Sequence, residues 1–339
     1  MICQRALILS LAVLTCLTGC AFGGNLRVEP VAVTAQKPSN VALFVAVSEH
    51  GHSVLALQPE SFSVLENGVL LDSRQVGLTL LPTPSAVARR ALLLVDMSRS
   101  LDDAQRAALE SSLRALIVKL RARQIVSLYA FDGSEHVHYI CDYAKDARAE
   151  PDEKDTSMQK LLSFSRSDAS SSLYSAVLEA THKLDASLSA DKLPIGLGTM
   201  IVIAQNPDLA GRASEEAVRS AIDAAHHQYF LVMVGPWSTD KDIAWLGKNG
   251  AVRAGSLNTM LEPLQGVADQ IDEASFRYYL VSYCSPARAG TRQLELRVTT
   301  SDEQGKKSEG SYRTDFDATG FGPGCNAQSV PRFPTTKSP

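Results

Sequence analysis

Residues 91–100 read Ala-Leu-Leu-Leu-Val-Asp-Met-Ser-Arg-Ser, and they give the clearest indication of the fold class. Five apolar residues end abruptly at Asp96, a pattern typical of a buried central strand in a parallel sheet. Asp96, Ser98 and Ser100 follow at alternate positions. Because open α/β sheets bind ligands beyond the carboxyl ends of their strands, we expect these three side chains to share a site. Their hard oxygen atoms suit Mg²⁺, Mn²⁺ or Ca²⁺ rather than zinc.

The same residues also fit an ordinary helix N-terminus. Ser98 or Ser100 would then cap the helix, and the helix dipole would favour the negative charge of Asp96. The two interpretations are compatible, since one loop can cap a helix and also hold a ligand.

Residues 89–275 alternate between strand and helix patterns. Short apolar runs predict buried strands, and apolar residues at helical spacing predict helices. The predicted strands are 91–95, 124–131, 199–204 and 229–234, and the predicted helices include 109–120, 173–188, 240–248, 260–275 and one that begins after Ser214. This alternation is typical of βαβ units, so we predict an α/β domain on a parallel sheet.

The two ends of the chain carry strand patterns without a helical period. In the N-terminal β module, residues 41–82, Asn67-Gly68 between two apolar runs predicts a hairpin. Strand character returns over residues 276–325. We hypothesise that these late strands rejoin the N-terminal module, so that the α/β domain is inserted in a β-sandwich. Residues 20–40 are interpreted as a tether, and residues 326–339, rich in Pro, Ser and Thr, as a disordered tail.

The Asp96-x-Ser98-x-Ser100 pattern, between a hydrophobic strand and a helix, resembles the first metal-contact loop of a von Willebrand factor type A domain. The resemblance covers residues 90–275 and implies a Rossmann-like, doubly wound, mainly parallel sheet with a metal-ion-dependent adhesion site. The N-terminal module, with its Glu66-Asn67-Gly68 hairpin, resembles the immunoglobulin-like segment that precedes some bacterial domains of this family.

Two further loops of the family have counterparts in this chain. Ser171 stands where the family has threonine, which keeps the hydroxyl group, and Asn206 stands where it has aspartate, which removes one negative charge. The resemblance implies that Ser98, Ser100 and Ser171 bind Mg²⁺ or Mn²⁺ directly, with Asp96 and Asn206 acting through water or supporting the direct ligands from behind.

Cation affinity depends on the number of charged ligands, so the asparagine weakens the expected site. Asp208, two positions later, is a candidate to replace the lost charge if its loop bends back. The alternative is a von Willebrand A scaffold whose metal site has decayed, leaving recognition to the loops.

The first twenty residues predict export. Arg5 precedes an apolar core that is too short for a lasting transmembrane helix, so residues 1–19 fit a secretory signal. Leu17-Thr18-Gly19-Cys20 resembles the bacterial lipobox, which implies that Cys20 carries a lipid anchor. Ala21, in place of aspartate, favours the outer membrane of a Gram-negative cell envelope. The alternative is a plain signal peptide that happens to contain a cysteine.

Three cysteines remain after Cys20, and export permits disulfides. We favour a Cys284–Cys325 bond, which would hold the C-terminal tail to the body, although the spacing leaves Cys141 open as a partner. The net charge of -4 predicts neither nucleic acid nor an anionic membrane surface as a partner.

The expected function is binding: a lipid-anchored envelope protein that recognises a protein or envelope ligand. We expect no enzyme, because the chain has no Gly-x-Ser-x-Gly elbow and no Gly-rich phosphate loop. Two alternatives stay open at this point. One is a hydrolase with Ser98 or Ser100 as its nucleophile, and the other is a structural envelope lipoprotein with a non-functional metal site.

Overall fold

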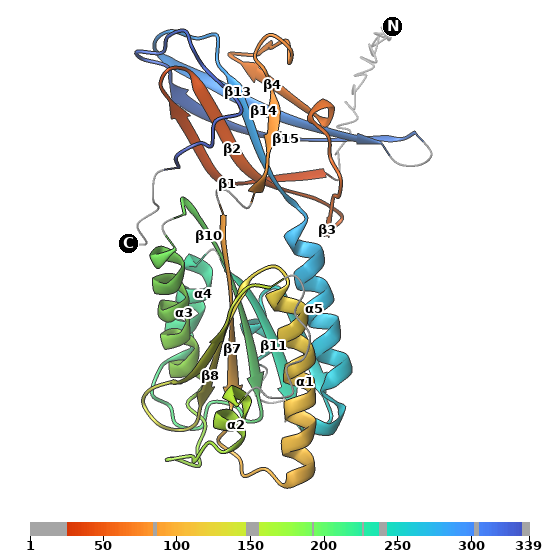
Figure 1. The fold of residues 1–339 in the computed structure, drawn as a ribbon, viewed down its shortest axis with the longest axis vertical. Helices are drawn as coiled ribbons and strands as arrows, with labels where there is room; N and C mark the ends of the chain where they lie inside the picture. The colour runs from red at the N-terminus through yellow and green to blue at the C-terminus, as the bar shows by residue number, and fades with distance from the viewer. Residues whose placement is uncertain are drawn as a thin grey trace, which may run out of the picture.

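The computed structural model describes residues 26–83, 87–146, 156–191, 193–225, 227–236, 243–301 and 305–333. The predicted signal and Cys20 lie outside these residues. The protein has two parts, a β module at one end and an α/β domain at the other (Figure 1). Among the described residues, no helix combines the length and the apolar character needed to cross a membrane.

The α/β domain is built on one six-stranded sheet with β7 among its central strands. The order is β12 (Gly250–Ala254), β11 (Gln228–Val234), β10 (Ile195–Ala204), β7 (Val87–Asp96), β8 (Ile125–Phe131) and β9 (His138–Tyr143). Neighbouring strands are parallel from β12 to β8, and only the edge strand β9 is antiparallel. The apolar run in β7 is completely buried because it has a strand on each side and helices on both faces.

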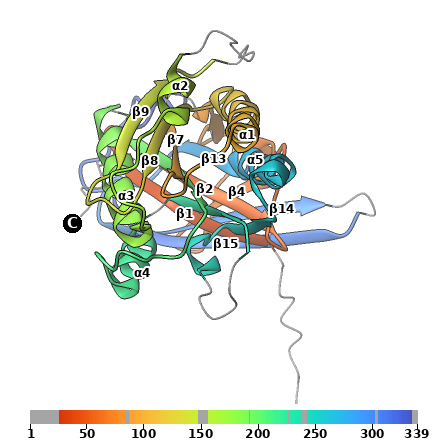
Figure 2. The ribbon, with the colours of Figure 1, turned by 90° about the horizontal axis from the view of Figure 1, so that it is seen from below.

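Helices cover both faces of this sheet, as Figure 2 shows from the end opposite the β module. α1 (Asp103–Arg121) and α5 (Leu261–Ser275) pack on one face with Leu93 and Val95. α3 (Leu173–Ala190) and α4 (Glu215–Ala224) pack on the other face with Leu92 and Leu94. The short α2 (Ser157–Leu162) lies beside α1. Alternate residues of β7 therefore enter two separate cores, as expected for a strand between two helical layers.

The β module consists of two antiparallel sheets around one core. One sheet has the order β1 (Leu26–Gln36), β2 (Asn40–Glu49), β13 (Tyr278–Cys284) and β6 (Thr79–Leu81), with β3 (His52–Ser53) paired to β2. The other has the order β15 (Lys307–Asp317), β14 (Thr291–Ser301), β4 (Phe62–Glu66) and β5 (Val69–Leu70). Because β13 pairs with β2 and β14 pairs with β4, the α/β domain is inserted between two halves of one module.

A small apolar cluster joins the two parts. Ala42 and Phe44 of β2 meet Val87 at the start of β7 and Ile195 at the start of β10. The amino ends of the central strands therefore face the β module, and their carboxyl ends lie at the far end of the domain (Figure 1).

The predicted tether over residues 20–40 is wrong for residues 26–36, which form β1 and extend the module beyond residues 41–82. Leu26 and Val28 point into the core, but the register with β2 shifts between Pro30 and Ala32. Proline is confined to edges and bulges of sheets, and Pro30 in an edge strand meets that limit. The bulge interrupts the alternation, which is why the strand was not recognisable.

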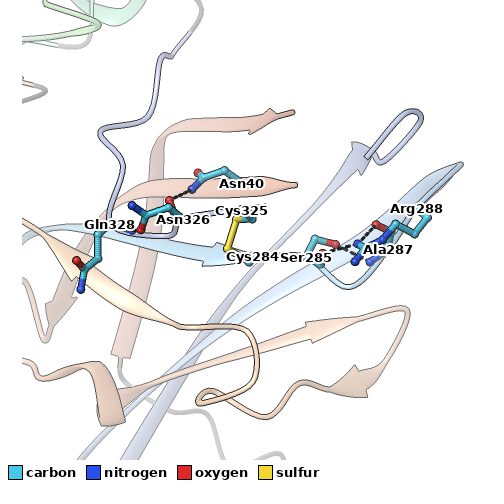
Figure 3. The surroundings of a disulfide bond; sticks show 8 residues. All are labelled: Asn40, Cys284, Ser285, Ala287, Arg288, Cys325, Asn326 and Gln328. Carbon is cyan, nitrogen blue, oxygen red and sulfur yellow. Dashed lines mark hydrogen bonds between the residues drawn. A yellow bond between two sulfur atoms is a disulfide. The ribbon is translucent and has the colours of Figure 1, made fainter. Parts of the chain in front are cut away.

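The predicted disordered tail over residues 326–339 is also wrong for residues 326–333. Cys284 and Cys325 form a disulfide with a Cα–Cα distance of 5.8 Å, and the chain beyond it stays on the module (Figure 3). Asn40 Nδ2 donates to the carbonyl of Asn326 at 3.0 Å, and Phe333 is buried in the apolar cluster that joins the two parts. The polar composition of residues 326–339 gave no indication of these contacts. Residues 334–339 lie outside the described residues.

The structure also differs from the prediction at three short elements. The expected helix over residues 240–248 is a single 3₁₀ turn, Ala244–Leu246, where it is described, and residues 237–242 lie outside the description. β12 and α2 were not expected. Such short segments bury few residues, so their patterns carry little signal. Cys141 is buried and is not part of the Cys284–Cys325 disulfide.

Candidate functional site

The candidate site lies at the carboxyl ends of β7 and β10, far from the β module. Its centre is the carboxylate of Asp96, which is wholly buried. Oδ1 accepts the Ser98 amide at 2.9 Å, and Oδ2 accepts the amides of Gln205 and Asn206 at 3.0 and 3.1 Å. The Ser171 hydroxyl donates to Oδ2 at 3.4 Å. Burial raises the pKa of Asp96, while these hydrogen bonds favour the ionised form and act against that rise.

Four of the five residues predicted for the site therefore converge. Asp96 ends β7 and Ser98 lies in the loop after it, while Asn206 comes from the loop after β10 and Ser171 from the loop before α3. All four are buried. Ser100 is exposed, and within the part of the chain that the structure describes its side chain has no hydrogen bond.

Arg99 and Asn206 close the outer side of this network. The Arg99 Nε donates to Asn206 Oδ1 at 3.0 Å, and Asn206 Nδ2 donates to Ser98 Oγ at 2.9 Å. A guanidinium group can only donate, so the amide oxygen must face Arg99 and the NH₂ group must face Ser98. Arg166 Nη1 also donates to the carbonyl of Ser98 at 2.9 Å. Two arginines thus hold the loop that the sequence pattern identified.

Asp208 does not replace the missing aspartate. Its carboxylate accepts the amide of Tyr174, in the first turn of α3, at 3.0 Å and the amide of Gly211 at 3.1 Å. The carboxylate therefore caps the N-terminus of α3, where negative charge is favourable. The same loop crosses Ser171, whose carbonyl accepts the amides of Leu209 and Ala210.

Asp132, at the end of β8, organises the neighbouring loop. It is buried and accepts the amides of Ser134, Ser167 and Asp168 at 2.8, 2.7 and 3.2 Å. Burial alone would raise the pKa of Asp132, but the hydrogen bonds outweigh it and lower the pKa to about 2. Its position directly after a strand was the signal that could have identified this role in the sequence.

The residues present do not fit a divalent cation. The Asp96 carboxylate already accepts four hydrogen bonds, Asn206 points an NH₂ group at Ser98, and Arg99 brings a positive charge to the amide oxygen. A cation would have to displace these donors and overcome repulsion from the guanidinium group. Among the described residues, no three His, Cys, Asp or Glu side chains are grouped so that they could hold a metal.

No protein-family model and no curated protein matches the chain. Among the solved structures that resemble it are two with low sequence identity. One is a von Willebrand factor type A protein from Catenulispora acidiphila, with 8% identity, a TM-score of 0.44, and coverage of 87% of this chain and 74% of that one. The other is the PilB minor pilin from Streptococcus sanguinis, with 10% identity, a TM-score of 0.37, and coverage of 74% and 79%. Likenesses at this level do not assign the chain to a family.

Proposed function

We propose that the protein is a binding protein of the cell envelope, of the von Willebrand factor A type, that recognises a protein or envelope ligand with the loops at the carboxyl ends of β7 and β10. The observation that carries this proposal is the convergence of Asp96, Ser98, Ser171 and Asn206 from three distant parts of the chain into one buried network. The mainly parallel sheet with helices on both faces supports the family assignment.

We also propose a lipid anchor at Cys20 in the outer membrane. The described chain begins in β1 of the β module, and the candidate site lies at the opposite end of the protein (Figure 1). An anchor on the side of the β module would therefore leave the site directed away from the membrane. This placement suits recognition of a ligand outside the layer to which the protein is attached.

Recognition at this site is proposed to need no bound cation. Arg99 places a permanent positive charge at the network, and only its Nε is used by a described residue. Its Nη atoms can bind an acidic group of the ligand through charge-assisted hydrogen bonds. Arg166, which reaches the same loop, can supply a second positive charge.

A hydrolytic role is not part of the proposal. The Ser98 hydroxyl accepts from Asn206, and no histidine among the described residues forms a hydrogen bond with Ser98 or Ser100. A serine nucleophile needs an adjacent base to be activated. The second candidate, a structural lipoprotein, differs because it would make its contacts through the β module.

Site-specific photocrosslinking in intact cells tests the proposal. A photoreactive residue is placed at Ser100, at the loop edge, or at Asp315, which is exposed on β15. We expect a discrete adduct from Ser100 that disappears in the Arg99→Glu variant, and none from Asp315. An adduct from Asp315 alone, unchanged by Arg99→Glu, would favour the structural lipoprotein.

A further inference from the structure

A cavity of about 590 Å³ lies at the junction of the two parts of the protein. Thr83 and Val87 line it on the segment that leads into β7, and Ser275, Phe276 and Tyr278 line it on the segment that leads out of α5. We call it the junction cavity. Its volume lies in the range of small-molecule sites, and described residues near both connections between the two parts line it.

The charges around the junction cavity are mainly positive. Arg89, Arg123 and Lys145 line it, together with one carboxylate, Asp191. Asp191 is already occupied, because Arg90 binds both of its oxygens at 2.6 and 2.7 Å and thereby lowers the pKa of Asp191.

Two of the three cations lack an acidic partner among the described residues. Arg123 pairs with Asp272. Lys145 and Arg89 form no ion pair with a described residue. The junction cavity therefore carries positive charge that the described residues do not neutralise.

Arg89 is the unusual member of this group. It is half-buried, yet its one hydrogen bond to a described residue is from Nη2 to the carbonyl of Ser275 at 3.3 Å. Its guanidinium group also lies 5.4 Å from the centre of the Tyr278 ring. Burial lowers the pKa of Arg89, and the charge of Arg123 acts in the same direction. Five N–H donors are present on an arginine, and a buried charge without a partner is costly. An anion in the cavity would accept hydrogen bonds from these donors and pair with the charge.

The wall beside Arg89 is apolar. Val87 and Ala88 are buried there, and Leu193 and Phe276 also line the cavity. We propose that the junction cavity binds a small organic anion whose carboxylate or phosphate pairs with Arg89 and whose apolar portion packs on Leu193 and Phe276. Such a ligand contacts both connecting segments, so it would hold the α/β domain at one orientation relative to the β module.

Calorimetric titration of the purified protein with octanoate and with octyl phosphate tests this proposal and separates the two head groups. We expect saturable binding of at least one of them that weakens as salt is raised, because the interaction is ionic. Arg89→Gln should weaken it about tenfold or more, since a charged hydrogen bond is lost. Arg89→Lys, which keeps the charge, should retain part of the affinity. Arg253→Gln, at an exposed arginine of β12, is the matched control and should bind as the wild type does.

Hydrogen exchange locates the binding. The bound anion should slow exchange in the two segments that line the cavity, near Arg89 and near Phe276, and leave the loop of Asp96 unchanged. The proposal fails if neither compound binds, if Arg89→Gln binds as tightly as Arg253→Gln, or if exchange slows only elsewhere. None of these outcomes depends on ligand recognition at the carboxyl ends of the strands.

Discussion

The charged groups at the two ends of the central sheet differ in how many hydrogen-bond partners they have. At the carboxyl ends of the strands, the buried carboxylate of Asp96 accepts four hydrogen bonds, and the nearby Arg99 is held by Asn206. At the amino ends, the half-buried Arg89 has a single hydrogen bond and no carboxylate partner among the described residues. The Asp96 carboxylate therefore has its hydrogen-bond partners without a ligand, whereas the Arg89 guanidinium group has one acceptor among the described residues. We therefore assign recognition of a ligand to the loops at the carboxyl ends of the strands, and binding of a small anion to the cavity at their amino ends.

The largest effect is expected from Asp96→Ala. The change leaves the buried amides of Ser98, Gln205 and Asn206 without an acceptor, at a cost of about 1–3 kcal/mol for each unsatisfied group that water does not reach. We expect the free energy of unfolding of the α/β domain to fall by about 3 kcal/mol or more in urea titrations. Ser100→Ala, in the same loop but exposed, should change it by less than about 0.5 kcal/mol. Equal effects of the two variants would show that the network does not hold the loops.

Arg90 and Arg89 provide a matched pair of neighbours. Arg90→Leu leaves the largely buried Asp191 without its bidentate partner, so we expect a loss of about 2–3 kcal/mol in the free energy of unfolding. Arg89→Leu breaks no ion pair with a described carboxylate, so a loss below about 1 kcal/mol is expected. The measurement is urea unfolding of both variants under one set of conditions. A larger loss from Arg89→Leu would mean that Arg89 already has the interactions it needs.

The Asp132 carboxylate is expected to contribute about 2 kcal/mol to the free energy of unfolding, in a pH-dependent way. Folding lowers the pKa of this carboxyl from 3.8 to about 2, so its ionised form stabilises the fold above pH 4. The contribution corresponds to about 1.4 kcal/mol per pKa unit and disappears as the pH falls from about 4 to 2. Asp132→Asn should therefore be less stable than the wild type at pH 7, and the gap should close at low pH. A gap that is constant from pH 7 to pH 2 would contradict this role of the carboxylate.

The fold was predictable where long patterns exist. The run that ends at Asp96, the alternation of strands and helices after it, and the return of strand character after residue 276 all reflect burial over many residues. β1 was not predicted because Pro30 interrupts its alternation of buried and exposed residues at a bulge. The packing of the tail was not predicted because few residues hold it, among them the disulfide and Phe333.

The grouping of the candidate residues was predictable in part, and their hydrogen bonds were not. The resemblance to the von Willebrand factor type A family implied that Asp96, Ser98, Ser100, Ser171 and Asn206 share a site. The structure brings four of them together and leaves Ser100 exposed. Spacing gives no side-chain direction, so it did not reveal that Arg99 binds the oxygen of Asn206. The junction cavity was not predictable either, because it depends on how the two parts of the protein meet.

Calorimetric titration of Mn²⁺ shows whether Arg99 and Asn206 close the site to a cation. We predict no saturable heat with the wild-type protein. The variant that combines Arg99→Ala with Asn206→Asp removes the guanidinium group and restores a second carboxylate, and it should gain saturable Mn²⁺ binding. Saturable binding by the wild type that Asp96→Asn abolishes would show that the site is open to a cation and make a bound cation part of recognition.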